Sequence, residues 1–386
     1  MPQQAFYMAY HVDQIARFTQ AGQRQKSIDY MQCLDHAMQQ QLKPWLDCVL
    51  QNSQDLIQLK LTLPTANFLS LQGWQAYYQH QYLIAHQYFS EIIDQDDWQQ
   101  YATDTALGMA KIYTRTGHWQ SAQDWCLYYL TLARKNLSHF DIAKGYGALA
   151  EIFLRANYPN EALACFQTAY HLMPIGHGQQ ARQYNFMASV LIRHKEWLRA
   201  ETLLHTSRQI SRNSLRLNQK NQDAHVSFLH SSMRLCYLNI MRYGEYDSIL
   251  TDDFKVDYMD GVNKKSGLSA LPIGMIHMAI GCHSLNQKNT AKVQFELAMQ
   301  CFTQQVPMEY QWALRLYTMC NEQAAAPRVS GIDQIFALQP YAVPQFDTVM
   351  DLTWRKVQLN NQGFAALIKE DLTAPQLAEL WKLFFI

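Results

Sequence analysis

Small and aromatic residues recur at helical spacing through residues 143–174, "AKGYGALAEIFLRANYPNEALACFQTAYHLMP". The first half places four apolar residues on one helical face: Tyr146, Leu149, Ala150 and Phe153. The second half does the same with Ala162, Phe166 and Ala169. Asn157 to Asn160 supply a turn between the halves, and Pro174 ends the second half. The stretch therefore predicts two antiparallel helices that pack on each other.

The same pattern of small and aromatic positions returns along the chain. It is found in residues 66–99, 103–136, 181–214 and 272–305, with a degenerate unit around Met233 to Tyr246. The alanine that packs near the start of each second helix falls at positions 85, 122, 162 and 200, so successive units are 37, 40 and 38 residues apart. A single helix pair cannot bury its apolar face alone, but stacked pairs can. Tandem units therefore favour a repeat architecture over a non-repetitive helical bundle.

This arrangement resembles the tetratricopeptide repeat, and residues 143–174 match every signature position of one unit. The family's usual period is about 34 residues, and the longer units here resemble those of bacterial regulatory tetratricopeptide proteins. Residues 181–214 are also similar to the tetratricopeptide output half of certain bacterial response regulators, although the sequence lacks the acidic cluster of a receiver domain. The resemblance implies an all-α fold, a TPR-like α-solenoid in which antiparallel helix pairs form a right-handed superhelix.

Three regions are expected from the extent of the repeats. Residues 1–62 read as N-terminal helices that form a cap or a degenerate repeat, residues 63–322 as the superhelix, and residues 323–386 as a C-terminal helical cap. The cap is expected because a terminal repeat needs a polar outer face, and "APQLAELWKLFFI" is amphipathic. The best strand candidate is the isolated stretch "DFKVDYM" at 253–259.

The resemblance also implies which residues face the concave side, because the first helix of each pair lines it. These positions carry an excess of cations. Position 13 of the unit, counted from Ala143 as position 1 in the stretch quoted above, is arginine in three successive units: Arg115, Arg155 and Arg193. The expected groove residues are Lys111, Arg115, Lys144, Arg155, Arg182, Asn185 and Arg193, with Asp104 and Glu151 as acids. Such a groove would favour an acidic segment or a free carboxylate. The alternative is that these arginines cap helix ends or pair with acids of the adjacent repeat.

A second basic surface is expected on one helix of the fourth unit. Arg208, Arg212 and Arg216 recur at every fourth residue and form one stripe. Residues 181–243 carry a net charge of +7, and residues 244–260 carry −5. The stripe is either a docking surface for an acidic partner or a solvated helix face that the acidic stretch neutralises.

Composition and the absence of known motifs exclude several classes of partner and activity. The formal net charge is zero, which argues against nucleic acid as the partner. Nucleotide-binding, hydrolase and metalloprotease motifs are absent from the sequence, so we expect no enzymatic activity, no cofactor and no metal. The residues of a carboxylate clamp, with which some relatives grip a partner's C-terminus, are replaced at Leu107 and Ala148. From the sequence we expect no signal peptide, no membrane span, reduced cysteines and a cytoplasmic location.

Two hypotheses for function follow. The first is a regulatory or assembly scaffold that binds a protein or peptide partner in the basic concave groove. The alternative is a sensor that binds a small molecule or a signalling peptide, or an output module of a signal-transduction system. A tight internal pocket with unpaired polar groups would favour the sensor, and an open groove would favour the scaffold.

Overall fold

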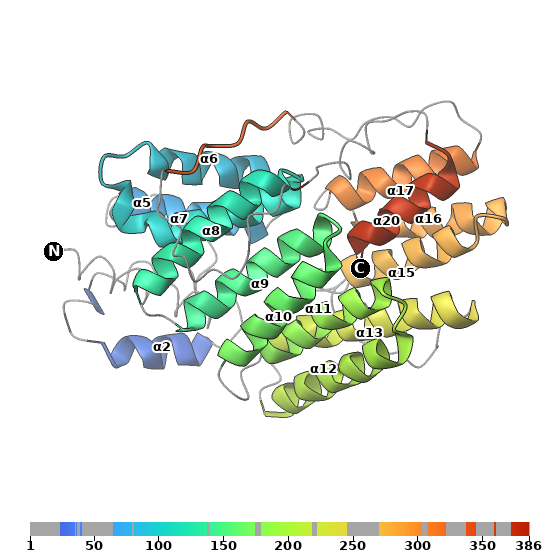
Figure 1. Cartoon of the computed structure of the whole chain (residues 1–386), viewed down its shortest axis with the longest axis horizontal. Helices are drawn as coiled ribbons and strands as arrows, with labels where there is room; N and C mark the ends of the chain where they lie inside the picture. Colours follow the sequence, from blue (N-terminus) through green and yellow to red (C-terminus); the bar gives the residue numbers. More distant parts are fainter. Residues whose placement is uncertain are drawn as a thin grey trace.

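The computed structural model describes residues 24–34, 36, 39–40, 65–78, 81–136, 139–173, 179–217, 222–244, 270–302, 307–321, 337–344, 359 and 372–385. Regular structure in these residues is helical throughout (Figure 1). Of the helices expected in residues 1–62, the described part contains α2 (Arg24–Gln32). The strand candidate at 253–259 lies outside the described residues, as does Pro174.

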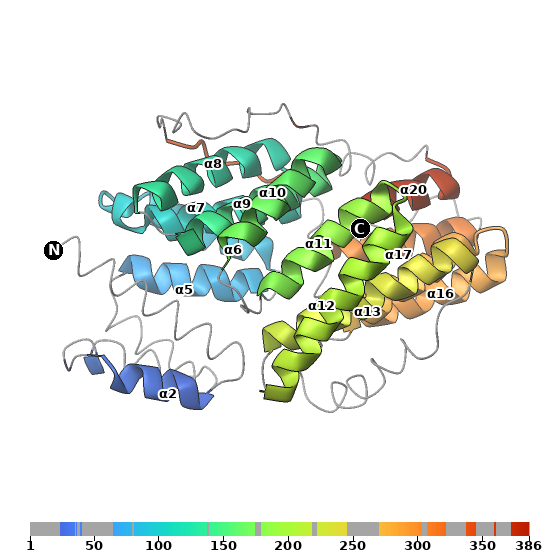
Figure 2. The same cartoon turned by 60° about the horizontal axis from the view of Figure 1, so that its bottom comes forward.

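Helix pairs follow one another where the sequence predicts them (Figures 1 and 2). The pairs are α5 (Thr65–Tyr78) with α6 (Tyr82–Ile93), α7 (Ala102–Thr116) with α8 (Trp119–Lys135), α9 (His139–Arg155) with α10 (Pro159–Leu172), α11 (Gln179–Arg193) with α12 (Trp197–Leu217), and α15 (Ala270–His283) with α16 (Lys288–Phe302). The remaining elements are η1 (Trp98–Tyr101), α13 (Gln222–Tyr243), α17 (Pro307–Cys320) and α20 (Ala374–Phe385).

The first helices of successive pairs form the inner wall of the stack. Helix α7 contacts α5 and α9, and α11 contacts α9 and α13, whereas the second helices pack mainly on the first helices beside them. In a curved stack, the helices that contact each other from unit to unit line the concave side. The residues that the sequence predicts for the concave side all belong to these first helices, which are called the inner helices below.

The turn inside each pair repeats at the level of the backbone. Gly117, Asn157 and Lys195 follow α7, α9 and α11, and each has a positive φ, of 83°, 66° and 59° respectively. In all three turns the next residue's N–H bonds to the carbonyl five residues earlier, as between His118 and Tyr113 at 2.9 Å. This left-handed cap satisfies the last carbonyls of the first helix. It also fixes the register of the alanine five residues later, at which the two helices cross.

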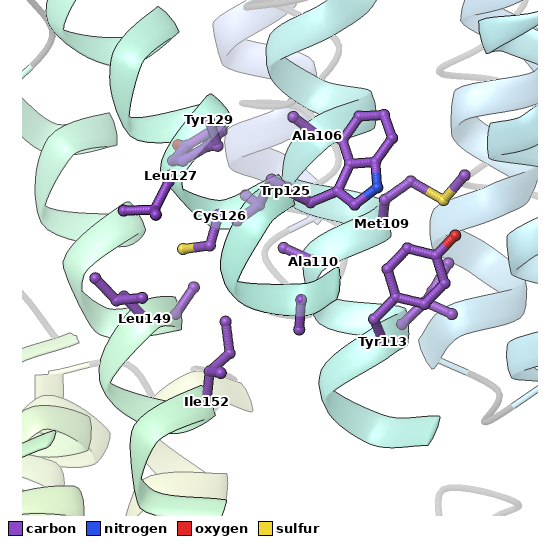
Figure 3. Packing of buried hydrophobic residues seen from close by; sticks show 14 of the residues in the cluster. Ala106, Met109, Ala110, Tyr113, Trp125, Cys126, Leu127, Tyr129, Leu149 and Ile152 are labelled. Atoms are coloured by element: carbon purple, nitrogen blue, oxygen red, sulfur yellow. The ribbon is translucent and has the colours of Figure 1, made fainter. Parts of the chain in front are cut away.

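Small residues allow the helices to cross closely. Ala110, Ala150, Ala162 and Ala188 are all fully buried, as the repeat pattern predicts. Figure 3 shows Ala106 and Ala110 of α7 among the larger side chains of α8 and α9, including Trp125 and Leu149. Packing at such crossings removes apolar area from water, which stabilises the fold by roughly 25 cal/mol per Å².

Buried residues form two core clusters. The first runs from α5 into α11 and includes Leu359, and the second runs from α11 to α20. Helix α20 packs on α17 and α15 and buries Leu377, Ala378 and Trp381 in the second cluster. Leu83 of α6 also packs on the second cluster, so the first described pair touches the far half of the stack.

One unit differs from its expected position. The sequence predicts the degenerate unit around Met233 to Tyr246, and its part up to Tyr243 belongs to a single helix, α13, that begins at Gln222. Its early turns place serines where other units have alanine, and Ser227 and Ser231 are buried there. The Ser231 hydroxyl lies 2.9 Å from the Ser207 hydroxyl of α12 and 2.7 Å from the Ser227 carbonyl. A buried hydroxyl with partners can replace a small apolar residue, and a pattern built on alanine misses it.

Candidate ligand-binding groove

Six cations gather on the inner helices and are called the cation cluster below. They are Lys111 and Arg115 of α7, Arg155 of α9, Arg182 and Arg193 of α11, and Arg234 of α13. Electrostatic interactions link them across four successive units. The helical repeat brings this about, because each inner helix presents the same face to the concave side.

Glu151 is the buried carboxylate at the centre of this cluster. Its side chain is only 8% exposed, and it lies 3.1 Å from Arg115 and 3.4 Å from Arg155. Burial acts to raise the pKa of Glu151, but Arg115, Arg155, Lys111 and Arg182 together hold that pKa well below its usual range. Glu151 is therefore ionised at neutral pH and offsets part of the positive charge.

The three arginines at position 13 also serve the structure. Arg115 pairs with Glu151 of the next unit, and Arg155 pairs with the same carboxylate one turn earlier in its own helix. Arg193 donates to the carbonyl of Leu154, in the last turn of the preceding inner helix. Helix capping and pairing between adjacent repeats, the alternative drawn from the sequence, thus account for contacts of all three.

Positive charge nevertheless remains in excess. Burial lowers the pKa of Arg193 to about 9, with Arg155 adding to the effect. Burial also lowers the pKa of Arg234 to about 10; Glu151 opposes this shift, while Arg155 and Arg182 add to it. In both cases burial is the main cause, and repulsion between the cations adds to it. An anion that entered the cluster would offset that repulsion.

Arg234 is the member of the cluster that the sequence did not reveal. Its side chain is 6% exposed, and its Nε donates to the Ser189 hydroxyl at 2.7 Å. His230 lies one turn earlier, and burial together with Arg234, Arg182 and Arg115 lowers the pKa of His230 to about 3. A sequence signal existed, because "SFLHSSMR" has small residues at helical spacing.

Aromatic residues line the same surface. Phe186 stacks on Phe166 with ring centroids 5.0 Å apart. The guanidinium groups of Arg182 and Arg234 lie 5.4 Å and 5.8 Å from the centroid of the Phe186 ring. Tyr77 makes a side-chain hydrogen bond to Arg115 at the other end. Aromatic rings and cations therefore lie together in this part of the inner helices.

Two more of the expected groove residues make contacts within the fold. Lys144 lies 3.2 Å from Asp141, one turn earlier, and 5.1 Å from the centroid of the Phe140 ring. Asn185 is buried, and its Nδ2 donates to the Ser227 carbonyl of α13 at 3.0 Å. These contacts tie Lys144 to its own helix and Asn185 to the next inner helix.

Asp104, the other acid expected in the groove, is held by neutral donors. It accepts hydrogen bonds from the Ser70 hydroxyl and from Trp74 Nε1 of α5, the latter at 2.9 and 3.0 Å. These contacts join the first two inner helices.

The second basic stripe packs partly on its neighbour. Arg208 and Arg212 lie 5.1 Å and 5.3 Å from the centroid of the Phe228 ring of α13, and Arg208 donates to the Ser232 hydroxyl at 3.1 Å. Arg212 and Arg216 are exposed. The acidic stretch expected to neutralise the stripe lies almost entirely outside the described residues.

Within the described ranges, no group of three or more histidine, cysteine or acidic side chains is placed to hold a metal ion. None of the described helices combines the length and the hydrophobicity that a membrane crossing requires.

Comparison with known proteins identifies the fold. No family model matches the chain, and no curated protein matches it. A crystal structure of a Rap protein complexed with competence and sporulation factor aligns over 82% of this chain and 98% of its own, with a TM-score of 0.51 and 10% identity. The apo form of RapI aligns over 76% of this chain and 97% of its own, with a TM-score of 0.47 and 10% identity. The match to the complexed Rap protein confirms the all-α fold of sequential antiparallel helix pairs that the tetratricopeptide resemblance implies.

Proposed function

We propose that this chain is a regulatory adaptor that acts in the cytoplasm and binds an acidic segment of a protein or peptide partner on its concave face. The observation that carries the proposal is the cation cluster, in which five of the six cations interact with the single carboxylate of Glu151. Repulsion from Arg155, which adds to the burial that lowers the pKa of Arg193 and of Arg234, supports it, because a bound anion would offset that repulsion.

The similarity of the fold to a Rap protein also supports a role in binding a protein or peptide, although it says nothing about which partner is bound. A Rap protein with the same helical arrangement has been crystallised with competence and sporulation factor. A stack of this type is therefore able to hold a signalling factor, and we carry that property to this chain as part of the proposal. The partner of this chain would be chosen by its own groove residues.

A sensor for a small molecule or a short signalling peptide is the second candidate. Gln183 Oε1 and Asn185 Oδ1 on α11 are buried and lack a hydrogen-bond partner among the described residues. Buried polar atoms without partners are costly, and a bound ligand that donates to them would remove the cost. This observation favours a compact ligand over a wide helical partner.

Arg182 offers the cleanest test. It is exposed, interacts with the cluster electrostatically, and stacks on Phe186. Arg182→Gln should therefore weaken partner binding with little effect on stability. Arg212→Gln is the matched control, because Arg212 is also exposed and also stacks on a phenylalanine, but lies on the outer helix α12.

The experiment captures partners from native lysate with each variant and quantifies proteins, peptides and small molecules by mass spectrometry. The scaffold proposal predicts an acidic protein that is retained by wild type and Arg212→Gln and reduced about tenfold with Arg182→Gln. A small ligand or a short peptide with the same dependence would instead support the sensor. Equal recovery of every species by wild type and Arg182→Gln would exclude the groove as the site.

A further inference from the structure

A short non-helical segment from the C-terminal part of the chain lies on the outer side of the first repeats. Residues 337–344, "ALQPYAVP", are here called the strap. The strap runs beside α6 and α8 in both views (Figures 1 and 2). Leu338, Tyr341 and Val343 pack on the first core cluster, most of which lies far earlier in the sequence.

Side chains of the repeats bind the strap through its backbone. The Tyr341 N–H donates to the Tyr113 hydroxyl at 2.7 Å, and Trp125 Nε1 donates to the Tyr341 carbonyl at 3.0 Å. His118 makes a hydrogen bond to the backbone of Leu338. The side chains of Tyr113 and Trp125, both buried, thus bind the N–H and the carbonyl of the same strap residue, Tyr341. Peptide-binding clefts obtain affinity from main-chain bonds of this kind and specificity from alternate side-chain pockets.

The side chain of Tyr341 makes specific polar and aromatic contacts with the repeats. The Tyr341 hydroxyl donates to both carboxylate oxygens of Asp94, each at 3.1 Å, and its ring lies 6.0 Å from the centroid of His86. Pro340 precedes it and restricts the backbone of Gln339 to extended conformations. The strap is therefore pre-organised, which lowers the entropy lost on binding.

The strap and its binding surface differ in burial. None of the strap residues is buried, and Ala337, Gln339, Pro340 and Ala342 are exposed. Tyr113 and Trp125 beneath it are fully buried. A segment with few buried contacts of its own opens at a low free energy, while the aromatic surface beneath needs a cover.

This surface is distinct from the cation cluster. Tyr113 lies on α7 between Lys111 and Arg115, which are one turn apart on the inner face. A residue midway between them projects from the opposite side of the helix. One helix therefore serves two sites, with the cations inside and the strap outside.

We propose that Asp94, Tyr113, His118 and Trp125 form a second peptide-binding site, the cradle, which accepts an extended Leu-x-Pro-Tyr-x-Val segment of a partner protein, and that the strap occupies it as an intramolecular ligand. A partner segment of this chemistry binds when the strap leaves. The strap thereby sets the threshold for that interaction, because its occupancy reduces the apparent affinity in proportion to the closed fraction.

The test uses the full chain and a fluorescein-labelled peptide with the sequence of residues 337–344 and blocked ends. Fluorescence anisotropy should show that Tyr341→Ala binds this peptide at least about tenfold more tightly than wild type, because the resident strap is weakened. Adding Tyr113→Phe removes the acceptor of the Tyr341 N–H, together with the hydrogen bond between the Tyr113 hydroxyl and His86. It should weaken peptide binding by about threefold to tenfold, the usual effect of one lost hydrogen bond to the ligand. Arg182→Gln should leave peptide affinity unchanged, which separates the cradle from the proposed groove function.

Two further measurements keep the outcome decisive. If Tyr341→Ala does not fold, Tyr341→Phe takes its place and should raise affinity by about threefold, since it loses only the Asp94 bonds. Hydrogen exchange of the Tyr341 amide should be slow in wild type and faster in Tyr113→Phe. The proposal is overturned if opening the strap leaves peptide affinity at the wild-type value, if Tyr113→Phe has no effect on it, or if the Tyr341 amide exchanges in wild type as fast as in the free peptide.

Discussion

Single residues decide where the helices of this protein can approach. The Phe89 ring is fully buried between α5 and α7, and a Cβ added at Gly108 would lie 2.5 Å from it. A Cβ added at Gly147 would meet only the end of the Gln183 side chain, at 3.4 Å. The two glycines therefore have different roles, although both stand inside helices.

Gly108→Ala should lower the free energy of unfolding by about 1–3 kcal/mol, because an enclosed ring cannot retreat from the added methyl group. Gly147→Ala should be neutral or raise that free energy by up to about 1 kcal/mol, since alanine favours helix. Urea unfolding followed by circular dichroism measures both. Equal effects of the two substitutions would contradict the close approach at Gly108.

Buried histidines make the stability depend on pH. Burial, with His118 adding to it, lowers the pKa of His86 to about 4, and burial with Arg234 lowers that of His230 to about 3. The unfolded chain takes up protons on both near pH 6.5 while the folded chain does not, so stability falls as the pH drops below about 6.5. Glu151 adds a second loss only below about pH 4.5, because its pKa is lowered in the folded state.

Between pH 7 and pH 5 the free energy of unfolding should therefore fall by about 1–2 kcal/mol for each of the two histidines. His86→Gln should remove about half of this loss, since glutamine can still accept from the Tyr113 hydroxyl that lies 2.9 Å from His86. Denaturation midpoints across this pH range measure the effect. If the stability of wild type did not change between pH 7 and pH 5, the predicted pH dependence would be wrong. If His86→Gln had the same pH dependence as wild type, His86 would not contribute to it.

At the scale of the element, the turn inside each pair sets the repeat register. Gly117 and Lys195 occupy equivalent left-handed positions, with φ of 83° and 59°. Glycine adopts this conformation without strain, whereas a lysine does not. The same backbone therefore carries a strain at one turn that is absent from the other.

Substitutions at these two turns should reveal the strain at Lys195. Lys195→Gly should raise the thermal stability, by about 0.5–1 kcal/mol, and Gly117→Ala should lower it by about 1 kcal/mol. Differential scanning calorimetry reports both changes. Shifts of the same sign in the two variants would mean that the turns are not equivalent.

The sequence predicts elements well where the pattern is local. Ala122, Ala162 and Ala200 mark the second helices because the backbone turn always places such a residue five positions after its left-handed cap. The alanine pattern misses the first turns of helix α13, because buried serines with hydroxyl partners stand there in place of alanines. The contacts of Arg193 and Arg234 depend on which helix lies opposite, which no single unit's sequence contains.

For the whole molecule, stacking brings together residues that are far apart in sequence. Arg115 reaches Glu151 one unit later, and the strap reaches Tyr113 from the other end of the chain. The repeat pattern predicts the first type of contact, because it recurs from unit to unit. It does not predict the contacts of the strap, whose residues lie outside any repeat. All members of the cation cluster except Arg234 could therefore be named from the sequence, whereas the residues of the cradle could not.

The central claim is that the cation cluster binds negative charge. Its most direct test is the melting temperature of the full chain with hexaglutamate or hexaglutamine at constant ionic strength. We predict that hexaglutamate raises the melting temperature of wild type and of Arg212→Gln, that hexaglutamine does not, and that Arg182→Gln removes most of the rise. A rise that is as large in Arg182→Gln as in wild type, or no rise in wild type, would contradict the claim.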